Sequence, residues 1–224
     1  MKKVVIIGAG GFGWETLDVF EHMAVPEYEI LGFIVQSQYA KAGEMAHGLP
    51  VLGDFDWLEK HANEVLVSCS VGVPHQRRRL VEMAKKAGAR FCPMVVHKGT
   101  PDYHIQRETT FGEDVIIHGM NQISSGVQVG NHVHITGTLI GHNTIVKDLV
   151  TISPGCLIAG DVTIEEGAFI GMGAIIIEKL TIGAWSAVGA GATVIGNVPP
   201  DTTVVGVPAK VVQTRPTGWQ NFVE

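Results

Sequence analysis

The sequence predicts an α/β domain at the N-terminus, followed by a parallel β-solenoid. Two observations carry this prediction. An apolar, β-branched run near the N-terminus ends in a glycine-rich turn, and strand-like and helix-like segments then alternate up to about residue 96. After residue 110, a branched aliphatic or aromatic residue recurs at every sixth position.

The six-residue period is the strongest signal in the chain. An α-helix has about 3.6 residues per turn and a strand alternates every second residue, so neither gives this period. A parallel β-solenoid does, because each hexad supplies one short flat face and one corner. A five-residue step separates an early register from a longer one. The two registers are Phe111, Ile117, Ile123, Val129, Ile135 and then Ile140, Val146, Ile152, Ile158, Ile164, Ile170, Ile176, Ile182, Val188, Val194.

The N-terminal part begins with a strand over residues 3–7 and a turn of sequence GAGGFG, and a helix is expected over 14–23. Such a strand, turn and helix can bind phosphate through backbone N–H groups and the helix dipole. The same turn can also serve only to pack the helix on the strand. Further strands are predicted over 28–35, 64–71 and 89–96, and further helices over 54–62 and 74–88.

Two features of this part bear on a nucleotide ligand. A dinucleotide enzyme usually carries an acidic residue after the second strand, where this chain has Val35 and Gln36, so an NAD-dependent oxidoreductase is disfavoured. Pro74 opens a helix that contains three consecutive arginines, Arg77, Arg78 and Arg79. They form either a solvated face or a nucleotide contact.

Composition excludes several classes of protein. The net charge of -6 argues against nucleic acid as a general partner. Cys69, Cys92 and Cys156 lie in apolar runs, which is typical of buried thiols in a reducing compartment. No apolar run approaches the ~20 residues of a membrane span, so we expect a cytoplasmic protein.

The histidines are the candidates for chemistry. His142 lies two residues after an inward aliphatic, so it is expected at a corner, pointing outward, where it is either a general base or an exposed side chain without a role. His132 and His134 are two residues apart and could share one face of a strand. With His118 as a third ligand they could hold a metal, as in solenoid carbonic anhydrases.

The domain order, and several stretches along the chain, resemble bacterial sugar acetyltransferases of the sialic acid O-acetyltransferase type. Close relatives of these enzymes N-acetylate nucleotide-linked 4-amino-4,6-dideoxy sugars. The stretches are residues 4–13, 48–53 (GLPVLG), 71–79, 137–143 (GTLIGHN) and 158–209, which ends in the loop GVPA.

This resemblance implies a Rossmann-like nucleotide-sugar-binding domain (1–97), a connector (98–110), a left-handed β-helix acyltransferase domain (111–212) and a tail (213–224). It implies a homotrimer that binds acetyl-CoA between subunits and needs no metal. His142 matches the family's catalytic histidine, and Asn143 follows it. Substrate contacts are expected at Gly10, Gly11, Phe12, Val35 and Gly72, and acetyl-CoA contacts at Thr151, Gly160, Met172, Gly189 and Ala190.

The chain departs from the family at three places. Phe12 replaces a histidine that many members have in the glycine turn, Val35 and Gln36 replace acidic residues, and Asn143 replaces a carboxylate that raises the basicity of the catalytic histidine. We expect acetyl transfer to the amino group of a nucleotide-linked sugar. The alternatives are sugar O-acetylation, a metal-dependent carbonic-anhydrase-like activity, and a nucleotide-binding module without activity.

Overall fold

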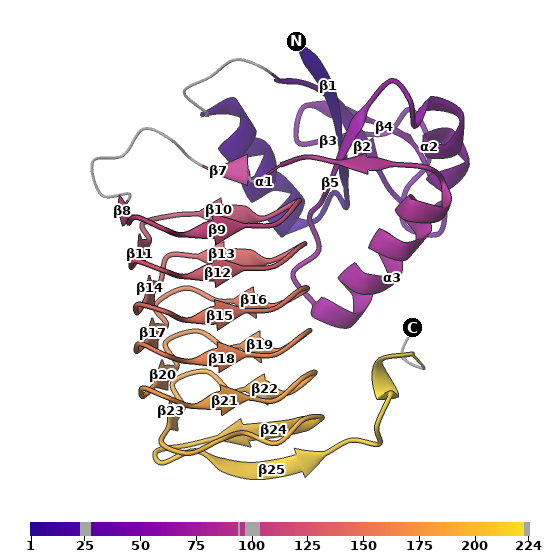
Figure 1. Ribbon diagram of the computed structural model, residues 1–224. Helices are drawn as coiled ribbons and strands as arrows, with labels where there is room; N and C mark the ends of the chain where they lie inside the picture. Colours follow the sequence, from indigo (N-terminus) through magenta and orange to yellow (C-terminus); the bar gives the residue numbers. More distant parts are fainter. Residues whose placement is uncertain (23–27, 94, 97–103, 222–224) are drawn as a thin grey trace.

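The computed structural model describes residues 1–22, 28–93, 95–96 and 104–221, and shows an α/β domain packed against the upper coils of a β-helix (Figure 1). Residues 98–103 of the expected connector and 222–224 of the expected tail lie outside the described residues. The predicted fold class, an α/β domain followed by a parallel β-helix, is confirmed.

The sheet of the α/β domain has the strand order β3-β4-β2-β1-β5-β6, and only β3 runs antiparallel to its neighbour. The central strand β1 pairs with both β2 and β5, so the carboxyl ends of these strands meet at one edge. The strands are β1 (Lys2–Ile7), β2 (Tyr28–Ile34), β3 (Met45–Ala46), β4 (Leu49–Gly53), β5 (Leu66–Cys69) and β6 (Arg90–Phe91).

Helices cover both faces of this sheet because alternate residues of β1 point to opposite sides. Val4 and Ile6 pack with α1 (Gly11–Glu21), while Val5 and Ile7 pack with α2 (Phe55–His61) and α3 (Pro74–Lys86). The predicted α2 and α3 are confirmed with their start signals: Asp54 caps α2 by accepting from Asp56 N, and a proline opens α3.

Two predicted elements differ from the structure. Helix α1 starts at Gly11, earlier than expected, because Gly10 takes the extended N-cap conformation and its carbonyl accepts from Trp14 N. The segment 89–96 is not one strand. It divides into β6, which pairs with β5, and β7 (Val95–Val96), which pairs with β10 of the β-helix.

The β-helix stacks short parallel strands into three sheets, each formed by every third strand up to β23, and β24 extends one of these sheets beside β22. The strands are β8 (His104–Ile105), β9 (Thr110–Phe111), β10 (Ile116–His118), β11 (Gln122–Ile123), β12 (Gln128–Val129), β13 (His134–Thr136), β14 (Leu139–Ile140), β15 (Ile145–Val146), β16 (Thr151–Ile152), β17 (Leu157–Ile158), β18 (Thr163–Ile164), β19 (Phe169–Ile170), β20 (Ile175–Ile176), β21 (Thr181–Ile182), β22 (Ala187–Val188), β23 (Thr193–Val194) and β24 (Thr202–Val205).

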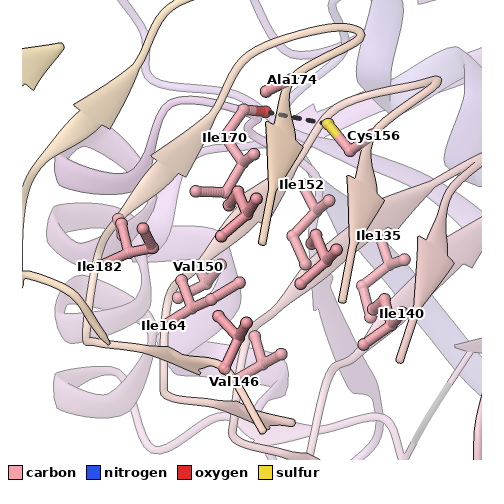
Figure 2. Packing of buried hydrophobic residues seen from close by; sticks show 14 of the residues in the cluster. Ile135, Ile140, Val146, Val150, Ile152, Cys156, Ile164, Ile170, Ala174 and Ile182 are labelled. Carbon is pink, nitrogen blue, oxygen red and sulfur yellow. Dashed lines mark hydrogen bonds between the residues drawn. The ribbon is translucent and has the colours of Figure 1, made fainter. Parts of the chain in front are cut away.

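The repeating aliphatic residues form one continuous core along the axis of the β-helix. Figure 2 shows Ile135, Ile152 and Ile170 in a row on successive coils, from right to left, and all three are fully buried. Small residues fill the space at the corners, where Cys156 Sγ contacts the carbonyl of Ile170. Each coil buries its inward face only against its neighbours, so the core requires the stack.

The chain closes with β25 (Lys210–Thr214), antiparallel to β24, and the short helix η1 (Trp219–Asn221). The segment after β25 turns back toward α3 (Figure 1), and the Trp219 ring contacts His75 at the start of that helix, with 5.2 Å between ring centroids.

Within the part of the chain that the structure describes, every helix is too short or too polar to cross a membrane.

Candidate active site

Arg77 joins the two domains. Its side chain is fully buried between α3 and the β-helix. One terminal nitrogen donates to Thr151 Oγ1 at 3.0 Å and to the carbonyl of Val71 at 2.7 Å, and the other donates to the carbonyls of Leu149 and Val150 at 2.6 and 3.1 Å. Burial lowers the pKa of this guanidinium to about 10, so it remains charged at neutral pH.

Sequence reasoning missed this role, although a signal was present. Arg77, Val81 and Ala84 recur at the spacing of one helix face, and all three are buried. The run of arginines therefore divides: Arg77 faces the β-helix, Arg78 pairs with Glu82 at 2.9 Å, and Arg79 lines a pocket of the α/β domain.

His134 belongs to the same contact between the domains. Its Nδ1 accepts from Arg77 at 3.0 Å, its Nε2 lies 3.0 Å from the carbonyl of Cys69, and the Phe12 ring stacks on it at 4.5 Å. Burial, and secondly the charge of Arg77, lower the pKa of His134 well below its usual value. This ring is therefore a neutral structural group, and Phe12 packs against it.

His132 has other buried partners, so it does not form with His134 the pair of metal ligands considered as an alternative. Its Nδ1 lies 3.2 Å from Asp114, whose carboxylate also accepts from the Ser68 hydroxyl and from Cys69 N. Since both ring nitrogens of His134 already have protein partners, the described histidines do not converge on a metal.

A pocket of about 490 Å³ lies at the carboxyl ends of β1 and β2, where the chain crosses between the faces of the sheet. Gly10 and Val35, two of the residues expected to contact the substrate, line it, and Arg79 and Glu44 are its charged residues. The first turn of α1 carries no acidic residue, so its N–H groups are suited to a phosphate. Gly11 begins that helix beside the pocket.

His142 lies at the corner between β14 and β15, where the periodicity placed it. Its side chain is 63% exposed. The ring lies over Gly160 of the next coil, close enough that a Cβ on that glycine would approach His142 Cε1 to 2.6 Å. The absence of a side chain at Gly160 therefore makes room for the imidazole ring. The five-residue step lies one corner earlier, at Gly137, whose φ is +47°.

A carboxylate accompanies His142 from the next coil. Asp161 Oδ2 lies 4.0 Å from His142 Nδ1, and Asp161 Oδ1 accepts from Asn143 Nδ2 at 3.1 Å. Many family members have a carboxylate at the position of Asn143. In this chain Asn143 instead binds the carboxylate of Asp161. The sequence contained the signal, because Asp161 follows Asn143 by one full coil of hexads.

The remaining predicted residues fall in two places. Thr151 and Gly72 lie between the domains, where the Thr151 hydroxyl donates to the Gly72 carbonyl at 2.7 Å. Met172 is 59% exposed at the corner after β19, and Gly189 and Ala190 occupy the same corner one coil further on. This corner and the His142 corner lie at opposite edges of the sheet that contains β14, β17 and β20.

Residues 3–84 match the PglD N-terminal domain family. No curated protein sequence is significantly similar to the chain.

Solved structures similar to this chain extend along almost its whole length. A mutant of perosamine N-acetyltransferase from Caulobacter crescentus, solved with CoA and GDP-perosamine, has a TM-score of 0.83 and 26% identity over 95% of this chain and 98% of that one. WeeI from Acinetobacter baumannii AYE has a TM-score of 0.82 and 28% identity over 95% and 100%. The acetyltransferase domain of PglB from Neisseria gonorrhoeae FA1090, solved with acetyl coenzyme A, has a TM-score of 0.79 and 25% identity over 94% and 99%.

These similarities bear on the whole architecture and not only on one domain. The N-terminal match, the β-helix and the neighbours of known structure fit the sugar acetyltransferase family that the sequence predicted, and the protein is an acyltransferase.

Proposed function

We propose that the protein transfers the acetyl group of acetyl-CoA to the amino group of a nucleotide-linked sugar, with His142 as the general base. The observation that carries this proposal is the exposed imidazole beside Asp161, on a fold shared with perosamine N-acetyltransferase. As the amine attacks the thioester carbonyl, His142 Nε2 takes the proton that the nitrogen loses. The proton is then returned to the leaving thiolate of CoA. A positioned base of this kind contributes about 10²- to 10⁴-fold to the rate.

The nucleotide is expected in the pocket at the carboxyl ends of β1 and β2. We expect its diphosphate to accept hydrogen bonds from the N–H groups at the start of α1 and from Arg79. The first turn of α1 carries no acidic residue and Arg79 is positively charged, which supports this placement. Gly10 and Val35 line the pocket wall. Because Val35 and Gln36 are uncharged, Glu44 is the carboxylate that lines the pocket. It can accept a hydrogen bond from a ribose hydroxyl or from the base.

A complete acetyl-CoA site is expected to need more than one subunit. Within one chain, His142 and the corner of Met172, Gly189 and Ala190 lie at opposite edges of one sheet. The outward residues of that sheet include Leu139, Leu157 and Ile175, which are 36%, 48% and 40% exposed. Burying this aliphatic strip against neighbouring copies would bring the corners of different subunits together. This supports the trimer that the resemblance implies.

The proposal is tested by release of free thiol from acetyl-CoA in the presence of 4-amino-4,6-dideoxy sugars linked to GDP, UDP, dTDP or CMP. At least one of them should release thiol and give an N-acetylated product by mass spectrometry. Thiol release with a product acetylated on a hydroxyl group would establish O-acetylation instead. Binding of a nucleotide without any thiol release would identify a binding module.

Replacing Gly160 with alanine should lower kcat by about 10- to 100-fold, because the new Cβ displaces the imidazole and misplacement by about 1 Å can cost this much. The fold should persist, since the group that must move is the exposed end of a side chain. Gly196→Ala is the matched control, because a Cβ there meets nothing within 4 Å. Equal kcat values for the two variants would contradict the role of Gly160.

Replacing Asp161 with asparagine should lower kcat by about tenfold and leave KM unchanged, because the carboxylate acts on the base and not on substrate binding. Asp148→Asn is the control: Asp148 also accepts from an asparagine of another coil, Asn131, at 3.1 Å, but lies at a different corner. An increase in KM, or an equal decrease in kcat in both variants, would show that Asp161 has only a structural role.

A further inference from the structure

His47 links two walls of the pocket at the carboxyl ends of β1 and β2. Its Nε2 lies 3.0 Å from the carbonyl oxygen of Ala9, a residue 38 positions earlier in the chain. Ala9 belongs to the glycine turn after β1, whereas His47 lies in the turn between β3 and β4. Ala9 lines the pocket, and so do the three residues that precede His47, which are Glu44, Met45 and Ala46. The proposed function gives this histidine no role, although it joins the two segments.

The turn at His47 does not by itself require an imidazole. Strands β3 and β4 form a hairpin with a two-residue turn, in which His47 has a φ of +48° and Gly48 a φ of +84°. Turns of this kind need a positive φ at both central residues, and asparagine followed by glycine is the common solution. Histidine tolerates this conformation as well, but it gives the hairpin no advantage over asparagine. What distinguishes histidine at this position is therefore what its ring contacts.

Two aromatic residues fix the His47 ring. It stacks on Trp14, with 5.1 Å between the ring centroids and 9° between the planes, and it makes a T-shaped contact with Phe33 of β2 at 6.0 Å. Phe33 is fully buried, whereas Trp14 is 61% exposed on the first turn of α1. Stacked and T-shaped arrangements are the favourable ones for aromatic rings. They hold the imidazole beside the glycine turn and fix the direction of its Nε2.

The hydrogen bond to Ala9 orients a peptide group of the glycine turn. A carbonyl oxygen can only accept, so His47 Nε2 is the donor. The C=O and N–H of a trans peptide point in opposite directions, so this bond also fixes the direction of the Gly10 N–H. Among the residues that the structure describes, the N–H groups of Gly10 and Gly11 have no acceptor, and a Cβ on either glycine would meet nothing within 4 Å. These donors are therefore available to an anion in the pocket.

We propose that His47 is a positioning residue for the diphosphate of the nucleotide sugar. It sets the direction of the Gly10 N–H and ties the hairpin of β3 and β4 to the glycine turn. This inference rests on the proposed function, because it takes the nucleotide to bind in this pocket. Donors that are already ordered lose less conformational freedom on binding. The loss of His47 should therefore weaken substrate binding and leave the chemical step unchanged.

The test is the kinetics of His47→Asn, which keeps the turn and removes the ring. KM for the nucleotide sugar that the wild type acetylates should rise by about tenfold, the effect of one lost hydrogen bond. Isothermal titration with GDP, UDP and dTDP should show the same loss for the diphosphate that the wild type binds most tightly. Both kcat and KM for acetyl-CoA should be unchanged, because His142 lies on the β-helix. Trp14→Leu should raise KM by about threefold, and the double variant should bind no more weakly than His47→Asn, because Trp14 acts through His47.

His61→Asn is the matched control and should keep wild-type kinetics. His61 also stacks on a tryptophan, Trp57, at 4.0 Å, and its Nδ1 lies 2.8 Å from a backbone carbonyl, but it does not line the pocket. The inference is overturned if His47→Asn keeps the wild-type KM for the nucleotide sugar. It is also overturned if kcat and the affinity for acetyl-CoA fall in that variant, which would show that His47 only stabilises the fold. A wild-type protein that binds none of the three diphosphates would overturn the proposed function together with this inference, whereas equal binding by the wild type and His47→Asn overturns the inference alone.

Discussion

Replacing His142 with asparagine should lower kcat for acetyl transfer by about 10²- to 10⁴-fold, the usual contribution of a positioned general base. The imidazole is 63% exposed and its Nδ1 lies 4.0 Å from Asp161, so its removal leaves no buried group unpaired. The thermal midpoint and the oligomeric state should therefore match the wild type. KM for the nucleotide sugar should change little, because the nucleotide is expected in the α/β domain.

His61→Asn provides the control for this experiment. His61 is a half-buried imidazole on α2 that stacks on Trp57, with 4.0 Å between the ring centroids, away from the candidate site. It should retain wild-type kcat. A folded His142→Asn enzyme with near-normal turnover would remove the general base from the mechanism, even if acetyl transfer itself were established.

Replacing Arg77 with methionine should destabilise the protein by about 3–5 kcal/mol, because several buried acceptors lose their donor and each unsatisfied one costs about 1–3 kcal/mol. Methionine fills part of the space but leaves the carbonyls of Leu149 and Val150 and the ring of His134 without their donor. Chemical denaturation should show the loss. Limited proteolysis should cut the α/β domain before the β-helix, because the contact between them is what the substitution weakens.

Arg78→Met is the control for Arg77. Arg78 forms an i,i+4 pair with Glu82, and its guanidinium lies 5.6 Å from the centroid of the Trp185 ring on the β-helix. Contacts of these two kinds contribute only about 0.3–1 kcal/mol each, so this variant should lose much less stability than Arg77→Met. A comparable stability of the two variants would show that the buried guanidinium does not hold the domains together.

How much of the molecule the sequence predicts depends on how local the signal is. The hexads and the start signals of α2 and α3 depend on neighbours within a few residues, and these elements were predicted correctly. Arg77 was not, because its partners on the β-helix are 57 to 74 residues away along the chain and contact it only when the domains pack. The same reason explains why Thr151, expected beside acetyl-CoA, lies between the domains.

The candidate site shows the same division. The six-residue period predicts that His142 lies at a corner. Its carboxylate partner, Asp161, lies on the next coil, so it is found only when residues one full coil apart are compared. Asn143 is the instructive residue. In the sequence it stands where many family members have a carboxylate, but in the structure its side-chain amide donates to the Asp161 carboxylate at 3.1 Å.

The one shortened repeat of the β-helix shows where such a chain can change its length. The five-residue step falls at Gly137, between β13 and β14, yet Ile135 still pairs with Ile152 and Ile140 still pairs with Ile158. The residue is missing from a bend, where it would not take part in the pairing between strands. Deletions and grafted loops at such bends should therefore leave the stack in alignment, whereas the loss of a single residue within a strand would turn its aliphatic side chain out of the core.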